Sequence, residues 1–72
     1  MAPFKYRLRE TLIEYAYELA KKELKLEEAH HNLKECSTSI AKSRQLLIIE
    51  QFELDIRRLK LEIEAAKQQL SA

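Results

Sequence analysis

The sequence contains no glycine and no tryptophan, and its one proline is Pro3. Without glycine, and without an Asn-Gly or Asp-Gly step, β-hairpins lack the residues that their tight turns require. The abundant residues, among them Leu, Glu, Lys, Ala, Ile and Gln, are those that lose least on entering a helix. The composition therefore excludes a strand-rich fold and predicts an all-α protein.

Long apolar runs are also missing, since none approaches the roughly 18–20 residues of a membrane span. The first residues lack the apolar core of a signal peptide. The one cysteine, Cys36, leaves no partner for an internal disulfide, which is typical of a reducing compartment. These absences predict a cytoplasmic protein that does not bind a membrane.

The sequence has no large excess of positive or negative charge, because 13 Lys and Arg are balanced by 12 Asp and Glu, giving a net charge of +1. Nucleic-acid binding normally needs a basic face. Lys5, Arg7 and Arg9 form a small basic cluster, and nucleic-acid binding through them is the least supported alternative. The basic residues at 57–60 lie among acidic ones and are expected to form a solvated, ion-paired surface.

Two heptad patterns are present, with apolar residues at alternating steps of three and four. They define the predicted seam, the set of residues at which two helices pack together. Its first half contains Leu8, Leu12, Tyr15, Leu19, Lys22, Leu26, Ala29, Leu33, Cys36 and Ile40, and its second half contains Ile49, Phe52, Ile56, Leu59, Ile63, Ala66 and Leu70.

The two patterns are out of phase, because Ile40 and Ile49 are separated by a heptad plus two residues. The mismatch follows Ser37, Thr38 and Ser39, whose hydroxyl groups favour caps and turns. We predict one domain over 1–72: a helix over about 3–36, a connection over about 37–40 and a helix over about 40–70. A single unbroken helix is the alternative, since no Gly or Pro enforces a stop.

The predicted fold is thus a two-helix antiparallel hairpin of the coiled-coil type, completed into a bundle by a partner or by copies of the chain. Folding the chain near residues 40–41 pairs large residues with small ones. The resulting layers include Ala29 with Phe52, Tyr15 with Ala66, and Lys22 with Leu59. Within the seam, Lys22 either fixes the register or extends its ammonium group to solvent.

A second set of apolar residues lies nearly opposite the seam, at 100° per residue. In the second helix it recurs every seven residues, and the first helix has a weaker counterpart that includes Tyr6, Ile13 and Ala20. The residues predicted to bind a partner are Leu47, Leu54, Leu61, Tyr17 and Leu24. The alternatives are scattered surface leucines, a second copy of the chain, or a different protein.

Few residues of this sequence could serve as metal ligands or catalytic groups. Glu27, His31 and Glu35 share one helix face, but the adjacent His30 diverges from it and Cys36 belongs to the seam, so four convergent zinc ligands are not expected. Cys36 has no pocket in which a base could activate it. We expect no catalytic residue, no metal, no cofactor and no small-molecule substrate, and therefore no enzyme.

The opening residues Phe4, Lys5, Tyr6, Arg7 and Leu8, followed by Leu12, resemble the start of flagellar export stalk proteins of the FliJ kind and their type III secretion relatives. That resemblance implies an antiparallel helical hairpin, although family members are usually longer. In size, shape and neutral charge the chain also resembles the small co-chaperones of type III secretion needle subunits. That second resemblance implies a partner with helical repeats, which would contact Leu47, Leu54 and Leu61.

The sequence thus predicts a protein-binding module, an adaptor or chaperone-like subunit of a larger assembly, with type III secretion as one setting. The alternative is a structural helical bundle that assembles from copies of the chain and has no client.

Overall fold

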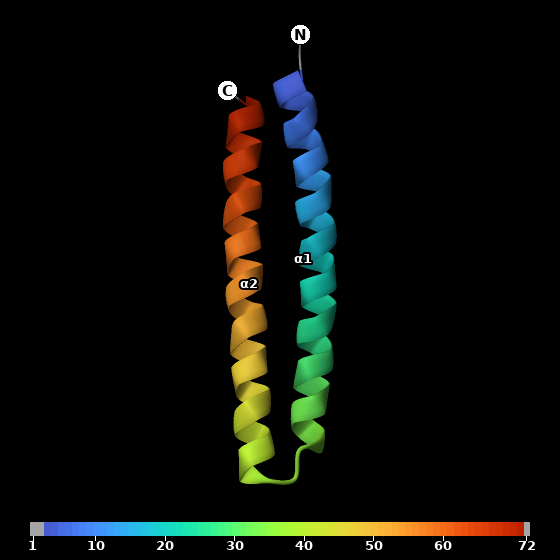
Figure 1. Ribbon diagram of the computed structural model, residues 1–72, viewed down its shortest axis with the longest axis vertical. Helices are drawn as coiled ribbons and strands as arrows, with labels where there is room; N and C mark the ends of the chain where they lie inside the picture. Colours follow the sequence, from blue (N-terminus) through green and yellow to red (C-terminus); the bar gives the residue numbers. More distant parts are fainter. Residues whose placement is uncertain (1–2, 72) are drawn as a thin grey trace.

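The chain is an all-α helical hairpin. The computed structural model describes residues 3–71, with side chains over 7–71, and contains α1 (Pro3–Glu35) and α2 (Ser39–Ser71). The two helices lie side by side and antiparallel, with the connection at one end (Figure 1). No strand occurs in this part of the chain. The alternative of one unbroken helix is therefore wrong.

Hydrogen bonds define the connection between the helices. The Cys36 N–H donates to the Leu33 carbonyl at 3.2 Å, in the last turn of α1. The Thr38 Oγ1 accepts a hydrogen bond from the Ala41 N–H at 3.1 Å. Thr38 therefore caps the N-terminus of α2 and satisfies one of the amides that have no partner within the helix. This cap brings Ser39 into α2, slightly earlier than the sequence predicted.

The register of the helices differs from the expected one. Lys22 was expected opposite Leu59, but its Nζ lies 3.2 Å from the Oδ2 of Asp55, four residues earlier. Gln45 Nε2 donates a hydrogen bond to the carbonyl of Ala29 at 3.2 Å. The expected register placed Phe52, not Gln45, opposite Ala29. Lys22 also lies beside Phe52, seven residues before Leu59. The predicted register is thus wrong by about one heptad, or two helical turns, because the chain turns earlier than expected, directly after α1.

The core is narrow. Among the described residues only Ala29, Ile49, Ile56 and Ala66 are buried, and none of the large side chains is fully enclosed. Apart from Ile40, which is exposed, the remaining residues of the predicted seam are half-buried, because two helices alone cannot cover them. The accessible surface is 5885 Å², whereas a compact monomer of this length exposes about 4,700 Å². The hairpin therefore leaves much of its seam in contact with water.

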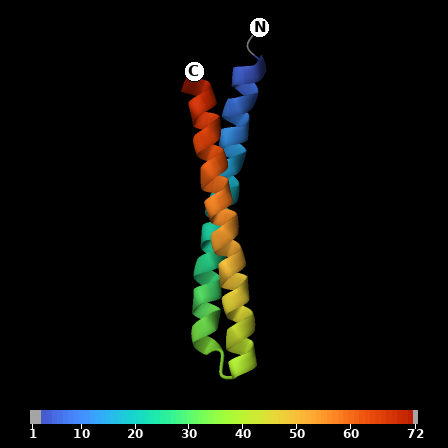
Figure 2. The same ribbon diagram turned by 90° about the vertical axis from the view of Figure 1, so that its left-hand side faces the viewer.

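The shape explains this exposure. The hairpin measures 58 × 14 × 13 Å, so it is a narrow rod made of two helices. In the view turned by 90°, the two helices cross each other along their length (Figure 2). Such winding is expected where a seven-residue apolar repeat keeps two helices in contact. Both long edges of the seam remain uncovered.

Thr38→Ala is predicted to lower the free energy of unfolding by about 1 kcal/mol, because it removes the cap of α2. Urea unfolding followed by circular dichroism measures this change. Thr38→Ser keeps the hydroxyl group and serves as the matched control. Equal stability of the Ala and Ser variants would contradict the capping role.

Candidate interaction surfaces

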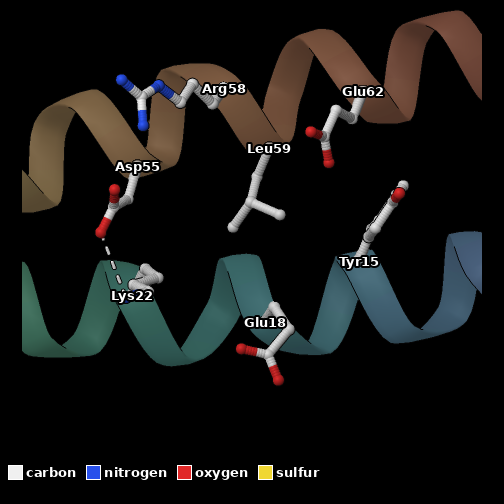
Figure 3. Close-up of a pocket in the computed structure, with 7 residues that line it drawn as sticks. All are labelled: Tyr15, Glu18, Lys22, Asp55, Arg58, Leu59 and Glu62. Atoms are coloured by element: carbon white, nitrogen blue, oxygen red, sulfur yellow. Dashed lines mark hydrogen bonds and ion pairs between the residues drawn. The ribbon is translucent and has the colours of Figure 1, made fainter.

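One edge of the seam is polar. A shallow groove along it is lined by Tyr15, Glu18, Lys22, Asp55, Arg58, Leu59 and Glu62 (Figure 3). In this view Leu59 lies between the two helices and Tyr15 extends from α1 toward α2. Charged groups thus border the apolar ones along this edge, which we call the polar edge. Its charged groups can remain hydrated without a further helix.

Lys22 is the centre of the polar edge. Its ammonium nitrogen lies 3.2 Å from the Asp55 carboxylate, the one ion pair between helices among the described side chains. The same nitrogen lies 5.6 Å from the centre of the Phe52 ring. Gln51 donates a second hydrogen bond to Asp55 at 3.0 Å. The ammonium group is thus held by α2, which favours a role in fixing the register over simple extension into water.

The pKa of Asp55 lies below its ordinary value of 3.8. The hydrogen bond from Lys22 is the main cause, and the hydrogen bond from Gln51 adds to it. Both donors stabilise the ionised carboxylate relative to the protonated one. The Asp55 carboxylate therefore stays charged in the folded chain at neutral pH and keeps its contacts across the two helices.

The opposite edge of the seam is aliphatic. Leu26 and Ile56 line a groove there whose rim is formed by Glu53, Arg57 and Lys60. Residues at steps of seven from Leu26 and Ile56 lean toward the same edge. This aliphatic edge comprises Leu12, Leu19, Leu26, Leu33, Ile49, Ile56, Ile63 and Leu70, all buried or half-buried. Every one of them is Leu or Ile, so the floor of this edge is apolar and its charged groups lie only on the rim.

The five residues predicted to bind a partner are all exposed. Leu47 is 66%, Leu54 43%, Leu61 67%, Tyr17 64% and Leu24 59% exposed. Leu54 lies two residues from both Phe52 and Ile56, so at 100° per residue it points away from the seam. Tyr17 and Leu24 point away from the seam of α1 for the same reason. The two groups therefore lie on opposite outer faces of the hairpin and do not form one surface.

Ile40 belongs with the exposed group on α2 rather than with the seam of the first helix. It is 67% exposed and lies seven residues before Leu47. The prediction that it extends the first seam is wrong, because α2 already begins at Ser39. Together with Leu47, Leu54 and Leu61, Ile40 forms a line that we call the α2 stripe. The shared seven-residue spacing was the sequence signal that could have placed it there.

The histidine and cysteine residues do not assemble into a site. His31 Nε2 lies 3.2 Å from Glu35 Oε1 on the exposed surface of α1. The Cys36 thiol donates to the Asn32 carbonyl at 3.3 Å and is half-buried. No group of three or more His, Cys, Asp or Glu in the described part of the chain could hold a metal ion. In the same part, no helix has a segment apolar enough to span a bilayer.

The side chains of Phe4, Lys5 and Tyr6 lie outside the described ones, so the predicted basic cluster is represented by Arg7 and Arg9 alone, both exposed. The seam residues Leu12, Tyr15, Leu19, Leu26, Ala29, Leu33, Ile49, Phe52, Ile56, Leu59, Ile63 and Ala66 are all buried or half-buried. The two predicted sets of residues thus lie in different environments, one between the helices and one on their outer faces.

The stability that Asp55 provides is predicted to depend on pH. Because its pKa is lower in the folded chain, this stability is complete above about pH 5 and is lost as the pH falls through 3.8 toward the folded-state value. Asp55→Asn should therefore destabilise the protein at pH 7 and have a smaller effect at pH 3. Thermal unfolding at both pH values measures the difference. Glu50→Gln, on an exposed carboxylate, is the control, and an equal effect of Asp55→Asn at both pH values would contradict the account.

The chain was also compared with known proteins. No protein-family model matches it, and neither a curated protein nor a solved structure matches it. What the protein does is therefore inferred from its own surfaces.

Proposed function

We propose that the hairpin is a non-enzymatic protein-interaction module, an adaptor or chaperone-like subunit of a larger assembly. The observation that carries the proposal is the α2 stripe, in which Leu47 and Leu61 are each about two-thirds exposed. Isolated surface leucines are ordinary, but four apolar residues at seven-residue spacing on one face of a helix are typical of a helix that packs against another protein.

The surroundings of the α2 stripe define the kind of partner. Glu50, Arg57 and Glu64 lie on one side of it, and Gln51 and Arg58 lie on the other. A helix with apolar residues at a matching spacing and charges of both signs beside them complements this surface. The proposed partner is therefore an amphipathic helix of another protein rather than a strongly charged polymer.

A secretion-related assembly is the proposed setting. What supports it is the resemblance of residues 4–8 to the start of flagellar export stalk proteins, together with the helical-hairpin fold. A cytoplasmic site of action remains a prediction of the composition. A structural bundle made of copies of the chain is the second candidate, and the exposed apolar residues of α1, Ile13, Tyr17 and Leu24, favour it.

One pair of substitutions is predicted to separate the seam from the α2 stripe. Ile56 is 8% exposed, so Ile56→Asp places a carboxylate in the seam and should unfold the chain. Leu54 is 43% exposed, so Leu54→Asp should leave the helices intact and abolish binding of the partner. Circular dichroism reports the first effect. Loss of helicity in a monomeric Leu54→Asp variant would contradict the assignment of the two faces.

Binding through the α2 stripe can be tested by photo-crosslinking in the cells that produce the protein. A photoreactive residue in place of Leu54 should form an adduct with another protein, and Leu61→Asp in the same chain should abolish this adduct. A photoreactive residue in place of Glu28, on α1, is the matched control. Adducts of equal yield at both positions, or none at Leu54, would contradict the proposed function.

A further inference from the structure

The helix α1 carries an apolar face wider than its seam needs. At 100° per residue, this face covers an arc of about 160°. Its members, in order around the helix, are Leu19, Leu12, Ala16, Ala20, Ile13, Leu24 and Tyr17. Within residues 12–20 of the sequence no charged residue falls in the arc, whereas Glu23 lies between the directions of Leu12 and Ala16. A helix that packs on one neighbour needs a stripe of roughly 100°, so the additional width is available to a second helix.

Most of this α1 face is exposed. Ile13 is 70% and Tyr17 is 64% exposed, and Ala16 and Ala20 are exposed between them. Lys21 borders the face, with its Nζ 4.8 Å from the centre of the Tyr17 ring. Only one margin of the face, at Leu12 and Leu19, takes part in the seam. The centre of the face therefore has no neighbour within the hairpin.

We propose that the α1 face binds the same face of a second copy of the chain. The two α1 helices run antiparallel about a two-fold axis at the level of residue 18. Ala16 then lies opposite Ala20 of the other copy, and Ile13 lies opposite Leu24. Small residues at the centre let the helix axes approach to about 8 Å, and the larger residues fill the space on either side. A two-fold axis makes every one of these contacts twice.

The charges on the α1 face complement each other under the same symmetry. Arg9 and Glu27 are separated by five full helical turns, so they point in the same direction, midway between Ala16 and Ala20. Both are exposed, and neither has an ion-pair partner among the described side chains. They are equally distant from residue 18, so the two-fold axis places Arg9 of each copy opposite Glu27 of the other.

A different dimer, with α1 of one copy against α2 of the other at the same level, is disfavoured by charge. The contact between Lys22 and Asp55 places Glu23 and Glu53 at nearly the same level. That dimer therefore brings Glu23 toward Glu53 across the aliphatic edges. It also brings Arg9 toward Lys67. Like charges in such positions are unfavourable, so the arrangement of charges selects the contact between the two α1 helices.

This inference rests on the proposed function, since it names a second copy as one partner of a protein-interaction module. The dimer leaves both α2 stripes on its outer sides, where each can bind another protein. The contact spans only part of one helix, so we expect a small interface and a dissociation constant in roughly the micromolar range. Self-association and binding through the α2 stripe are therefore separable.

Sedimentation equilibrium from about 5 µM to 1 mM tests the dimer. The wild-type chain should change from monomer to dimer over this range. Ala20→Arg should raise the dissociation constant at least tenfold with helicity unchanged. Ala65→Arg introduces the same residue at an exposed alanine of α2 and should leave the constant at its wild-type value. A monomeric wild-type chain, or equal dissociation constants for the two variants, would overturn the inference.

Charge reversal tests the orientation of the two copies. Arg9→Glu and Glu27→Arg should each weaken self-association by about fivefold, because each places like charges together twice. An equimolar mixture of the two variants should form a heterodimer as tight as the wild-type dimer, since one of its two ion pairs is the native one and the other is restored with reversed sign. A mixture no tighter than either variant would overturn the antiparallel arrangement. Loss of the Leu54 photo-adduct by Leu61→Asp would still support the proposed function in that case.

Discussion

The structure depends on one constraint, which is that two helices in contact can bury only one line of side chains. In this hairpin that line is the seam, and only Ala29, Ile49, Ile56 and Ala66 within it are buried. Two of these four are alanines, whose burial removes little apolar area from water. The seam therefore holds the helices together but leaves its large residues half-buried. A chain of this kind gains stability from any further helix that covers an edge of its seam.

The two edges of the seam differ in how favourably they are exposed to water. On the polar edge, the ion pair between Lys22 and Asp55 and the hydrogen bond from Gln51 place charged groups where water reaches them. On the aliphatic edge, the side chains between the helices are all Leu and Ile, and the charged groups are confined to the rim. Together with the apolar face of α1, the aliphatic edge makes one side of the hairpin largely apolar. The polar edge makes the other side hydrophilic. This asymmetry gives the hairpin a side for association and a side for solvent, and it leaves the α2 stripe as a separate surface.

Much of the fold followed from the sequence, because a heptad repeat and the absence of glycine leave few alternatives to a helical hairpin. The register did not follow, since it depends on where the chain turns. Matching Phe52 and Tyr15 to alanines favoured a later turn, whereas the hydroxyl of Thr38 caps α2 directly after α1. The same early turn moved Ile40 from the seam to the exposed face of α2.

The exposed residues were predicted to form one partner-binding surface, whereas they lie on two separate faces of the hairpin. Reading each helix by itself identified Tyr17 and Leu54 as pointing away from the seam, and both are exposed. Two helices that face each other must point such residues in opposite directions, so they belong to different surfaces.

The central claim is that the seam alone stabilises the hairpin weakly and that association adds the rest of the stability. Urea unfolding at about 5 µM and 500 µM protein tests it most directly: we predict a higher midpoint at the higher concentration, and a high midpoint that does not change with concentration would contradict the claim.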